Sequence, residues 1–133
     1  MRFRFAAFVL TASLTGTGAG LARITLPPDP DPPYSYIGSV EGVKFEWRNY
    51  HPSYGPDYWV SERVTNTNPY KVQASWRSRF YRENEAFDAG TTAATFGPGA
   101  VKYGERDGLW FVPFHGRPAT TIDISEIQVT PSF

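Results

Sequence analysis

The sequence predicts an all-β fold, an antiparallel β-sandwich of about seven strands that follows a leader and a proline-rich arm. Apolar and polar residues alternate with a period of two, as in Val43, Phe45 and Trp47 and again from Val72 to Phe80. This is the pattern of a strand with one buried and one solvated face. Turn-forming residues separate these runs at short intervals, as in a sandwich. No stretch after residue 22 combines the 3.6-residue period of a helix with capping residues.

Residues 1–22 have the three-part layout of a secretory signal peptide. Arg2 and Arg4 precede an apolar run over residues 5–15, and small residues follow up to Ala22. We expect cleavage after Ala22. The apolar run is about half of the ~20 residues that a membrane-spanning helix needs, so no membrane span is expected in the mature chain; a retained anchor is the alternative. The predicted location is periplasmic or secreted, and the chain has no cysteine for a disulfide or a lipid anchor.

Residues 23–33 form a predicted linker with five prolines between positions 27 and 33. Proline fixes φ and removes an amide donor, so this segment cannot join a helix or a sheet interior. Such a segment would form an extended, semi-rigid arm, or a disordered N-terminal tail, and the tail is the preferred interpretation.

Residues 34–133 form the predicted sandwich domain. Turn residues at Glu41–Gly42, 66–69, 97–99 and 107–108 separate the strands. The apolar residues of the last strand change parity between Ile124 and Ile127, which predicts a β-bulge at Ser125–Glu126 or a strand that changes its buried face. The seven predicted strands span residues 35–40, 43–50, 58–65, 71–81, 91–96, 109–114 and 120–129.

Charge excludes one class of partner. Without the leader, 11 basic residues stand against 13 acidic ones, and no basic run or nucleic-acid-reading motif occurs. No nucleic-acid partner is therefore expected.

Part of the sequence resembles exported bacterial immunoglobulin-like domains of the FxLyD type. The resemblance covers about 70 residues and rests on four segments: Val64-Thr65-Asn66, Val72 to Phe80-Tyr81, Pro98-Gly99 and Ile122 to Val129. It implies an immunoglobulin- or fibronectin-like sandwich and a non-catalytic module, and it carries over no functional residue. Residues 82–85 depart from the family, which often has an acidic residue and a glycine soon after Phe-Tyr.

The residues for catalysis or metal binding are few. His51 and His115 are the only histidines, and neither lies in a known ligand or triad spacing. The carboxylates Glu83, Glu85 and Asp88 fall in a predicted polar loop, where solubility is their expected role. We therefore expect no catalytic residue, no metal site and no cofactor. A hydrolase that pairs a loop histidine with carboxylates is the alternative.

Two groups of residues are candidates for ligand binding. Tyr50, Tyr54 and Trp59 lie in or beside a loop and would offer a ring platform, or would fold back over the end of the sheet. Arg77 and Arg79 lie on the solvated face of one strand. They would bind phosphate or carboxylate groups of an envelope polymer, or would pair with Glu46 or Glu62 on neighbouring strands.

These observations predict an exported, non-enzymatic binding or protein-interaction module of the cell envelope. Its expected partner is an envelope protein or a glycan. The alternatives are the secreted hydrolase and a structural subunit of an envelope assembly or appendage, which would pair an exposed edge strand with a strand of its partner.

Overall fold

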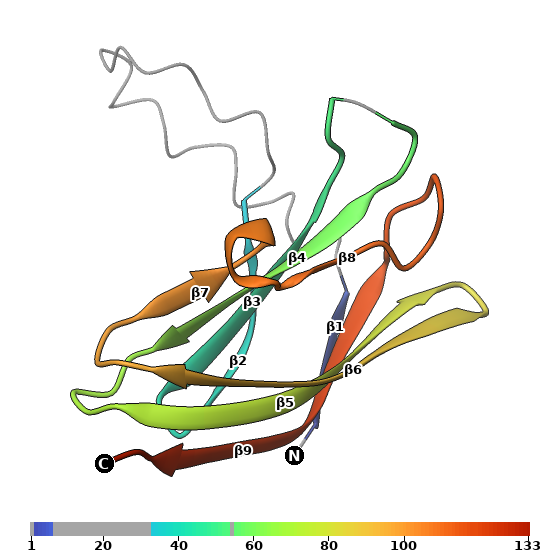
Figure 1. Cartoon of the computed structure of the whole chain (residues 1–133). Helices are drawn as coiled ribbons and strands as arrows, with labels where there is room; N and C mark the ends of the chain where they lie inside the picture. The colour runs from blue at the N-terminus through green and yellow to red at the C-terminus, as the bar shows by residue number, and fades with distance from the viewer. Residues whose placement is uncertain (1, 7–32, 54) are drawn as a thin grey trace, which may run out of the picture.

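In a computed structural model, which describes residues 2–6, 33–53 and 55–133, the chain forms two antiparallel sheets (Figure 1). The four-stranded sheet has the order β1-β9-β5-β6, and its strands are β1 (Arg2–Ala6), β9 (Thr121–Pro131), β5 (Val72–Arg82) and β6 (Glu85–Phe96). In the five-stranded sheet, β2 (Ser35–Val40), β3 (Val43–Tyr50), β4 (Trp59–Asn66) and β7 (Val101–Tyr103) lie in this order, and β8 (Trp110–Phe111) also pairs with β4. Within the described residues, the helical structure is a single 3-10 turn, η3 (Glu105–Asp107).

The hydrophobic core lies between the two sheets. Phe45 and Trp47 of β3 and Trp76 and Phe80 of β5 have at most 1% of their surface exposed. The rings of Phe45 and Trp76 meet edge to face across the sheets, with centroids 5.4 Å apart. Alternate residues of each strand thus bury their side chains as the period of two predicts, and the all-β sandwich is confirmed.

Most strand boundaries agree with the prediction, but three segments differ. The strands β2 and β3 have the predicted bounds, and β4, β5 and β9 differ from theirs by one or two residues. The prediction missed β7 and made β8 too long. It also began β6 at residue 91, whereas the strand begins at Glu85. Glu85 and Asp88 therefore lie on a strand and not in a polar loop, because a two-residue turn at Glu83–Asn84 pairs β6 with β5 along its full length.

The predicted turn at Glu41–Gly42 is a two-residue hairpin. Both residues have positive φ, 47° and 77°, as a type I′ turn requires. A Cβ atom on Gly42 would lie 2.3 Å from Oδ1 of Asn68 and would displace that side chain, and the positive φ also favours glycine here. The side-chain amide of Asn66 donates to the carbonyl oxygens of Tyr70 and Gly97. Asn68 of the predicted turn at residues 66–69 donates to the Glu41 carbonyl. The turns at 41–42, 66–69 and 97–99 are thus linked at one end of the sandwich.

The predicted β-bulge in the last strand is confirmed. Ser75 pairs with Gln128 but Arg77 pairs with Ser125, so β9 holds an extra residue here. Glu126 lies within the bulge and has φ of 52°. As a result, Ile122 and Ile124 are fully buried, and Ile127 and Val129 also pack against the core.

The strand β1 comes from the segment predicted as a leader. It pairs with β9 from Arg2 opposite Ser125 to Ala6 opposite Thr121. The predicted cleavage site, the proline-rich arm up to residue 32 and Tyr54 lie outside the described residues. Across the part of the chain that is described, no helix is long and apolar enough to cross a bilayer.

Candidate functional site

A groove crosses the outer face of the five-stranded sheet. Because Trp47 of β3 and Val60 and Glu62 of β4 point into the core, their neighbours in sequence point outward. The resulting hollow has a volume of about 200 Å³. We call it the aromatic groove, and its lining residues are Tyr34, Arg48, Tyr50, Trp59, Ser61, Tyr103, Gly104, Glu105 and Arg106.

The groove brings together two of the predicted binding residues, Tyr50 and Trp59. They are register partners on β3 and β4, and their rings meet edge to face with centroids 5.9 Å apart. Trp59 also packs on Trp110 of β8, at 4.3 Å between ring centroids. The rings are half-buried, so they both cover the sheet and present a surface to the groove. Such ring pairs hold each other in a fixed orientation.

Arginine side chains lie over the tyrosine rings of the groove. The guanidinium carbon of Arg48 is 4.5 Å from the centroid of Tyr34 and 5.6 Å from that of Tyr50. Arg63 lies over the same Tyr34 ring at 4.4 Å and forms a bidentate ion pair with Glu46, at 2.7 and 2.9 Å. Stacking on a ring holds a guanidinium group in place.

The opposite wall of the groove is the segment from Tyr103 to Arg106. The guanidinium of Arg106 lies 4.1 Å from the Tyr103 centroid and donates to the Val101 carbonyl and the Asp107 carboxylate. Gly104 has φ of 52°, and a Cβ atom on it would lie 3.6 Å from Oγ of Ser61. A Cβ atom would thus make an ordinary contact, and it is the positive φ that favours glycine at this position.

Burial keeps the phenol of Tyr34 neutral. It raises the pKa of Tyr34, against the opposing effect of Arg48 and Arg63. The hydrogen bonds from Arg63 to Glu46 raise the pKa of the Arg63 guanidinium, which stays charged. The groove thus combines neutral rings and hydroxyls with guanidinium groups, and Glu105 is the single carboxylate in its lining.

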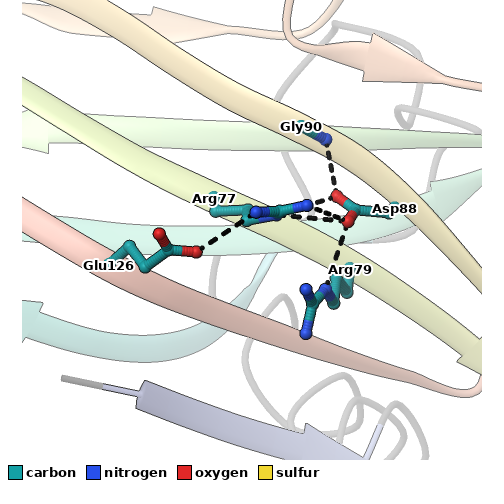
Figure 2. A network of polar contacts seen from close by, with 5 residues as sticks. All are labelled: Arg77, Arg79, Asp88, Gly90 and Glu126. Atoms are coloured by element: carbon teal, nitrogen blue, oxygen red, sulfur yellow. Dashed lines mark hydrogen bonds and ion pairs between the residues drawn. The ribbon is translucent and has the colours of Figure 1, made fainter.

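The other two predicted binding residues, Arg77 and Arg79, lie on the outer face of the four-stranded sheet, away from the aromatic groove. Figure 2 shows both side chains converging on Asp88 of β6. Nε of Arg77 donates to Asp88 at 3.1 Å, and Nε of Arg79 donates to it at 3.3 Å. Arg77 also reaches Glu126 at 3.5 Å. Hydrogen bonds from Arg77 and from the Gly90 amide hold the pKa of Asp88 far below its usual value.

The arginine ion pairs therefore form, but with carboxylates other than Glu46 and Glu62. Glu46 pairs with Arg63 on the opposite face. Glu62 is 1% exposed and lies between the sheets, where it accepts hydrogen bonds from Nε1 of Trp76 at 3.2 Å and from the Ser78 hydroxyl. Burial raises the pKa of Glu62 to about 7, against the opposing effect of these two hydrogen bonds.

The histidines lie outside the groove. Nδ1 of His115 is 3.2 Å from Oδ1 of Asp57, on a side chain that is 87% exposed. His51 packs on the ring of Tyr58, with centroids 4.6 Å apart. Among the described residues, no group of three histidine, aspartate or glutamate side chains is placed to hold a metal ion.

Sequence reasoning did not find Tyr34, Arg48, Tyr103 or Arg106. Tyr34 and Arg48 occupy positions that alternate with the buried residues of β2 and β3. Their outward direction could therefore have been predicted from the sequence. Tyr103 and Arg106 lie beside the very short β7, and the glycines at 104 and 108 are the only local sign that the chain bends there.

Comparisons with known proteins place the chain in no family. No family model matches it, so the resemblance to FxLyD-type domains is not confirmed, and no curated protein matches either. Among solved structures, the trimeric lipoprotein SadB of Salmonella enterica is 12% identical with a TM-score of 0.42; the match covers 74% of this chain, which spans 59% of SadB. The Avr2 effector protein of the plant pathogen Fusarium oxysporum is 12% identical with a TM-score of 0.34, over 99% of this chain and 87% of Avr2.

Proposed function

We propose that this protein is a non-enzymatic binding module that holds its ligand in the aromatic groove. The observation that carries the proposal is the meeting of Tyr50, Trp59 and Arg48 on one outward face, with the Tyr103–Arg106 wall opposite. The leader predicted from residues 1–22 supports a periplasmic or secreted location. The expected partner is an envelope protein or a glycan.

The chemistry of the groove favours a ligand with a flat or apolar surface and a negative charge. Tyrosine and tryptophan rings supply large contact areas and lose little conformational entropy on binding. Guanidinium groups recognise carboxylates and phosphates. The hydroxyl of Tyr34 is buried, so this residue contributes its ring to the groove.

The geometry supports binding over the hydrolase alternative. The pair His115–Asp57 lies on an exposed loop, with neither residue in the groove lining. Glu62 has the raised pKa of a general acid, but its carboxyl group is enclosed between the sheets, where a substrate has no access.

Binding screens test the proposal. The exported protein would be applied to arrays of acidic glycans and of envelope-derived peptides, and the best ligand would be measured against Trp59→Ala. Loss of a central ring typically weakens binding by about tenfold or more. Tyr70→Ala is the matched control, because Tyr70 is 46% exposed in the turn at the other end of β4. Equal binding by Trp59→Ala and wild type, both folded by circular dichroism, would remove the groove from the account.

A second candidate, the structural subunit, is favoured by one observation. The β9 edge from Thr121 to Ser125 pairs with β1, a segment of the predicted leader. Removal of the leader would expose this edge to a partner strand. Mass spectrometry of the exported protein tests the first step, and an intact Arg2–Ala6 segment on that protein would rule it out.

A further inference from the structure

The strand β6 forms an edge of the four-stranded sheet. It follows β5 in the sheet order, and within the part of the chain that the structure describes no strand pairs with its far side (Figure 1). An edge strand presents a row of amide and carbonyl groups to which a strand of another chain can add. Proteins commonly block such edges with charges, prolines, bulges or short strands. An edge without these protections is therefore a candidate interface.

The two halves of β6 differ in protection. The first half carries the charges of Glu85 and Asp88, and its register with β5 shifts at Ala89, which is an extra residue in β6. The second half, residues 90–96, reads Gly-Thr-Thr-Ala-Ala-Thr-Phe. It contains no charge and no proline, and it pairs with β5 without a further shift in register. This half of the edge is therefore unprotected.

The other edges of the two sheets are protected. The strands β7 and β8 are only three and two residues long, and β2 contains a shift in register beside Gly38. The strand β1 carries two arginines. The part of β9 that β1 does not cover contains the bulge at Glu126 and ends at Pro131. Among the described strands, residues 90–96 thus form the one edge segment that has none of these protections.

Residues 90–96 match a second copy of themselves. In an antiparallel pair centred on Ala93, the opposite residues are Ala93 and Ala93, Thr91 and Thr95, Thr92 and Ala94, and Gly90 and Phe96. Opposite residues are an even number of positions apart in sequence, so the backbone groups that point away from β5 in one copy face those of the other. Opposite threonines stabilise an antiparallel pair, and this register places no charged residue opposite another.

The surroundings of this edge favour the approach of a second copy. Thr91, Ala93 and Thr95 are exposed. Beside Ala93 the outer face holds a hollow of about 200 Å³, and its lining residues are uncharged: Gln73, Ala74, Ser75, Ala93, Gln128 and Thr130. Arg77, the register partner of Thr91, already pairs with Asp88. Contact around Ala93 therefore does not bury an unpaired charge, which would oppose association.

We propose that β6 pairs with β6 of a second copy of this chain, so that their two sheets become one continuous sheet across a two-fold axis at Ala93. The inference goes beyond the proposed function, because β6 belongs to the sheet that does not carry the aromatic groove. So short a pairing buries less surface than the interface of a permanent dimer. The dimer is therefore weak, and its population depends on the protein concentration.

Sedimentation velocity of the exported protein tests the proposal. Over a range of concentrations it should show a monomer–dimer equilibrium. Ala93→Lys places two like charges opposite each other at the axis and should weaken dimerisation by about tenfold or more. Gln128→Lys is the matched control, because Gln128 is exposed on the same face but lies on β9, two strands away from β6. It should dimerise as wild type does. Thermal unfolding confirms that each variant is folded.

Disulfide crosslinking tests the register, since the chain has no cysteine. Ala93→Cys brings two thiols together at the axis, where opposite Cα atoms are about 5 Å apart and a disulfide can form. Oxidation with diamide should therefore link the dimer. Thr95→Cys is the control, because Thr95 is exposed on the same edge but the two copies of this position lie roughly 13 Å apart along the strands. It should not crosslink.

A monomer at every concentration would overturn the proposal, even if an extended peptide of another protein added to the edge. A dimer that Ala93→Lys leaves unchanged would overturn it as well, and so would a dimer that Gln128→Lys weakens equally. Crosslinking of Thr95→Cys as efficient as that of Ala93→Cys would exclude the register. Because Ala93→Lys leaves the aromatic groove intact, ligand binding by this variant tests the proposed function separately.

Discussion

The outer faces of the two sheets both carry arginines, yet their arginines have different surroundings. On the four-stranded sheet, Arg77 and Arg79 meet the carboxylate of Asp88 (Figure 2). On the five-stranded sheet, Arg48 lies over the rings of Tyr34 and Tyr50, and Arg63 lies over Tyr34 while it also pairs with Glu46. The strand register determines which neighbour each arginine meets. The role of an arginine on a β-face therefore depends on the residue across from it more than on its own exposure.

The difference has a consequence for binding. A ligand at Arg77 and Arg79 would have to displace Asp88, which accepts hydrogen bonds from both and from the Gly90 amide. A ligand in the groove meets the faces of aromatic rings, and the guanidinium groups of Arg48 and Arg106 lie over tyrosine rings beside it. Three predictions test this contrast, in order of decreasing effect.

The largest effect is expected at Glu62, which links the two sheets behind both faces. Its pKa is about 7 in the folded protein and near 4.3 in an unfolded chain. Stability from this raised pKa is fully present below pH 4 and is lost as the pH rises through 7. The total loss by pH 8 amounts to about 3–4 kcal/mol, of which about 2–3 kcal/mol falls between pH 5 and 8. Glu62→Gln should remove this pH dependence, as measured by urea unfolding from pH 5 to 8.

Glu105→Gln serves as the control for Glu62→Gln, because Glu105 is exposed on the groove wall. The free energy of unfolding of the Glu105→Gln variant should change with pH in the same way as that of wild type between pH 5 and 8. A Glu62→Gln profile parallel to wild type would show that Glu62 does not titrate in the folded state, and the account of the buried link would be wrong.

The second effect concerns the contrast between the faces directly. Trp59→Ala should weaken ligand binding by about 1.4 kcal/mol or more, a tenfold change. The double variant Arg77→Gln/Arg79→Gln should bind as wild type does. Isothermal titration of both proteins with one ligand makes the comparison, and the reverse result would move the binding site to the other sheet.

The smallest effect is expected from Asp88→Asn, because its ion pairs are exposed to solvent. The pKa of Asp88 is lowered in the folded state. Its contribution to stability is therefore present above about pH 4 and is lost as the pH falls below that. The variant should lower the melting temperature slightly at pH 7 and low salt, and not at high salt. An equal loss at both salt concentrations would contradict an electrostatic origin.

Local alternation was enough to predict the hairpin of residues 35–50 and the bulge at Ser125–Glu126, because both depend on neighbours in sequence. The first half of β6 was missed because Glu85 and Asp88 suggested a loop. On the outer face Asp88 is acceptable, since Arg79 lies opposite it, but this partner is not visible in the sequence. The inward position of Glu62 was visible, because it shares its parity with Val60 and Val64.

The candidate site was predictable only in part. Tyr50 and Trp59 flank one loop, and their pairing follows from that connection. Tyr34 and Tyr103 join them because β2 lies beside β3 and β7 lies beside β4. Alternation predicts strands but not their order in a sheet. The sequence pattern of each strand alone therefore could not predict that these four residues lie together.

The four tryptophans offer the most direct test of the aromatic groove as the binding surface. Trp47 and Trp76 are fully buried in the core, and Trp59 and Trp110 stack at the groove. In a ¹H–¹⁵N spectrum, the indole signals would be followed during titration with the best ligand from the binding screens. The account predicts that the signals of Trp59 and Trp110 shift while those of Trp47 and Trp76 do not. Saturation with that ligand without a shift of the Trp59 signal would contradict it.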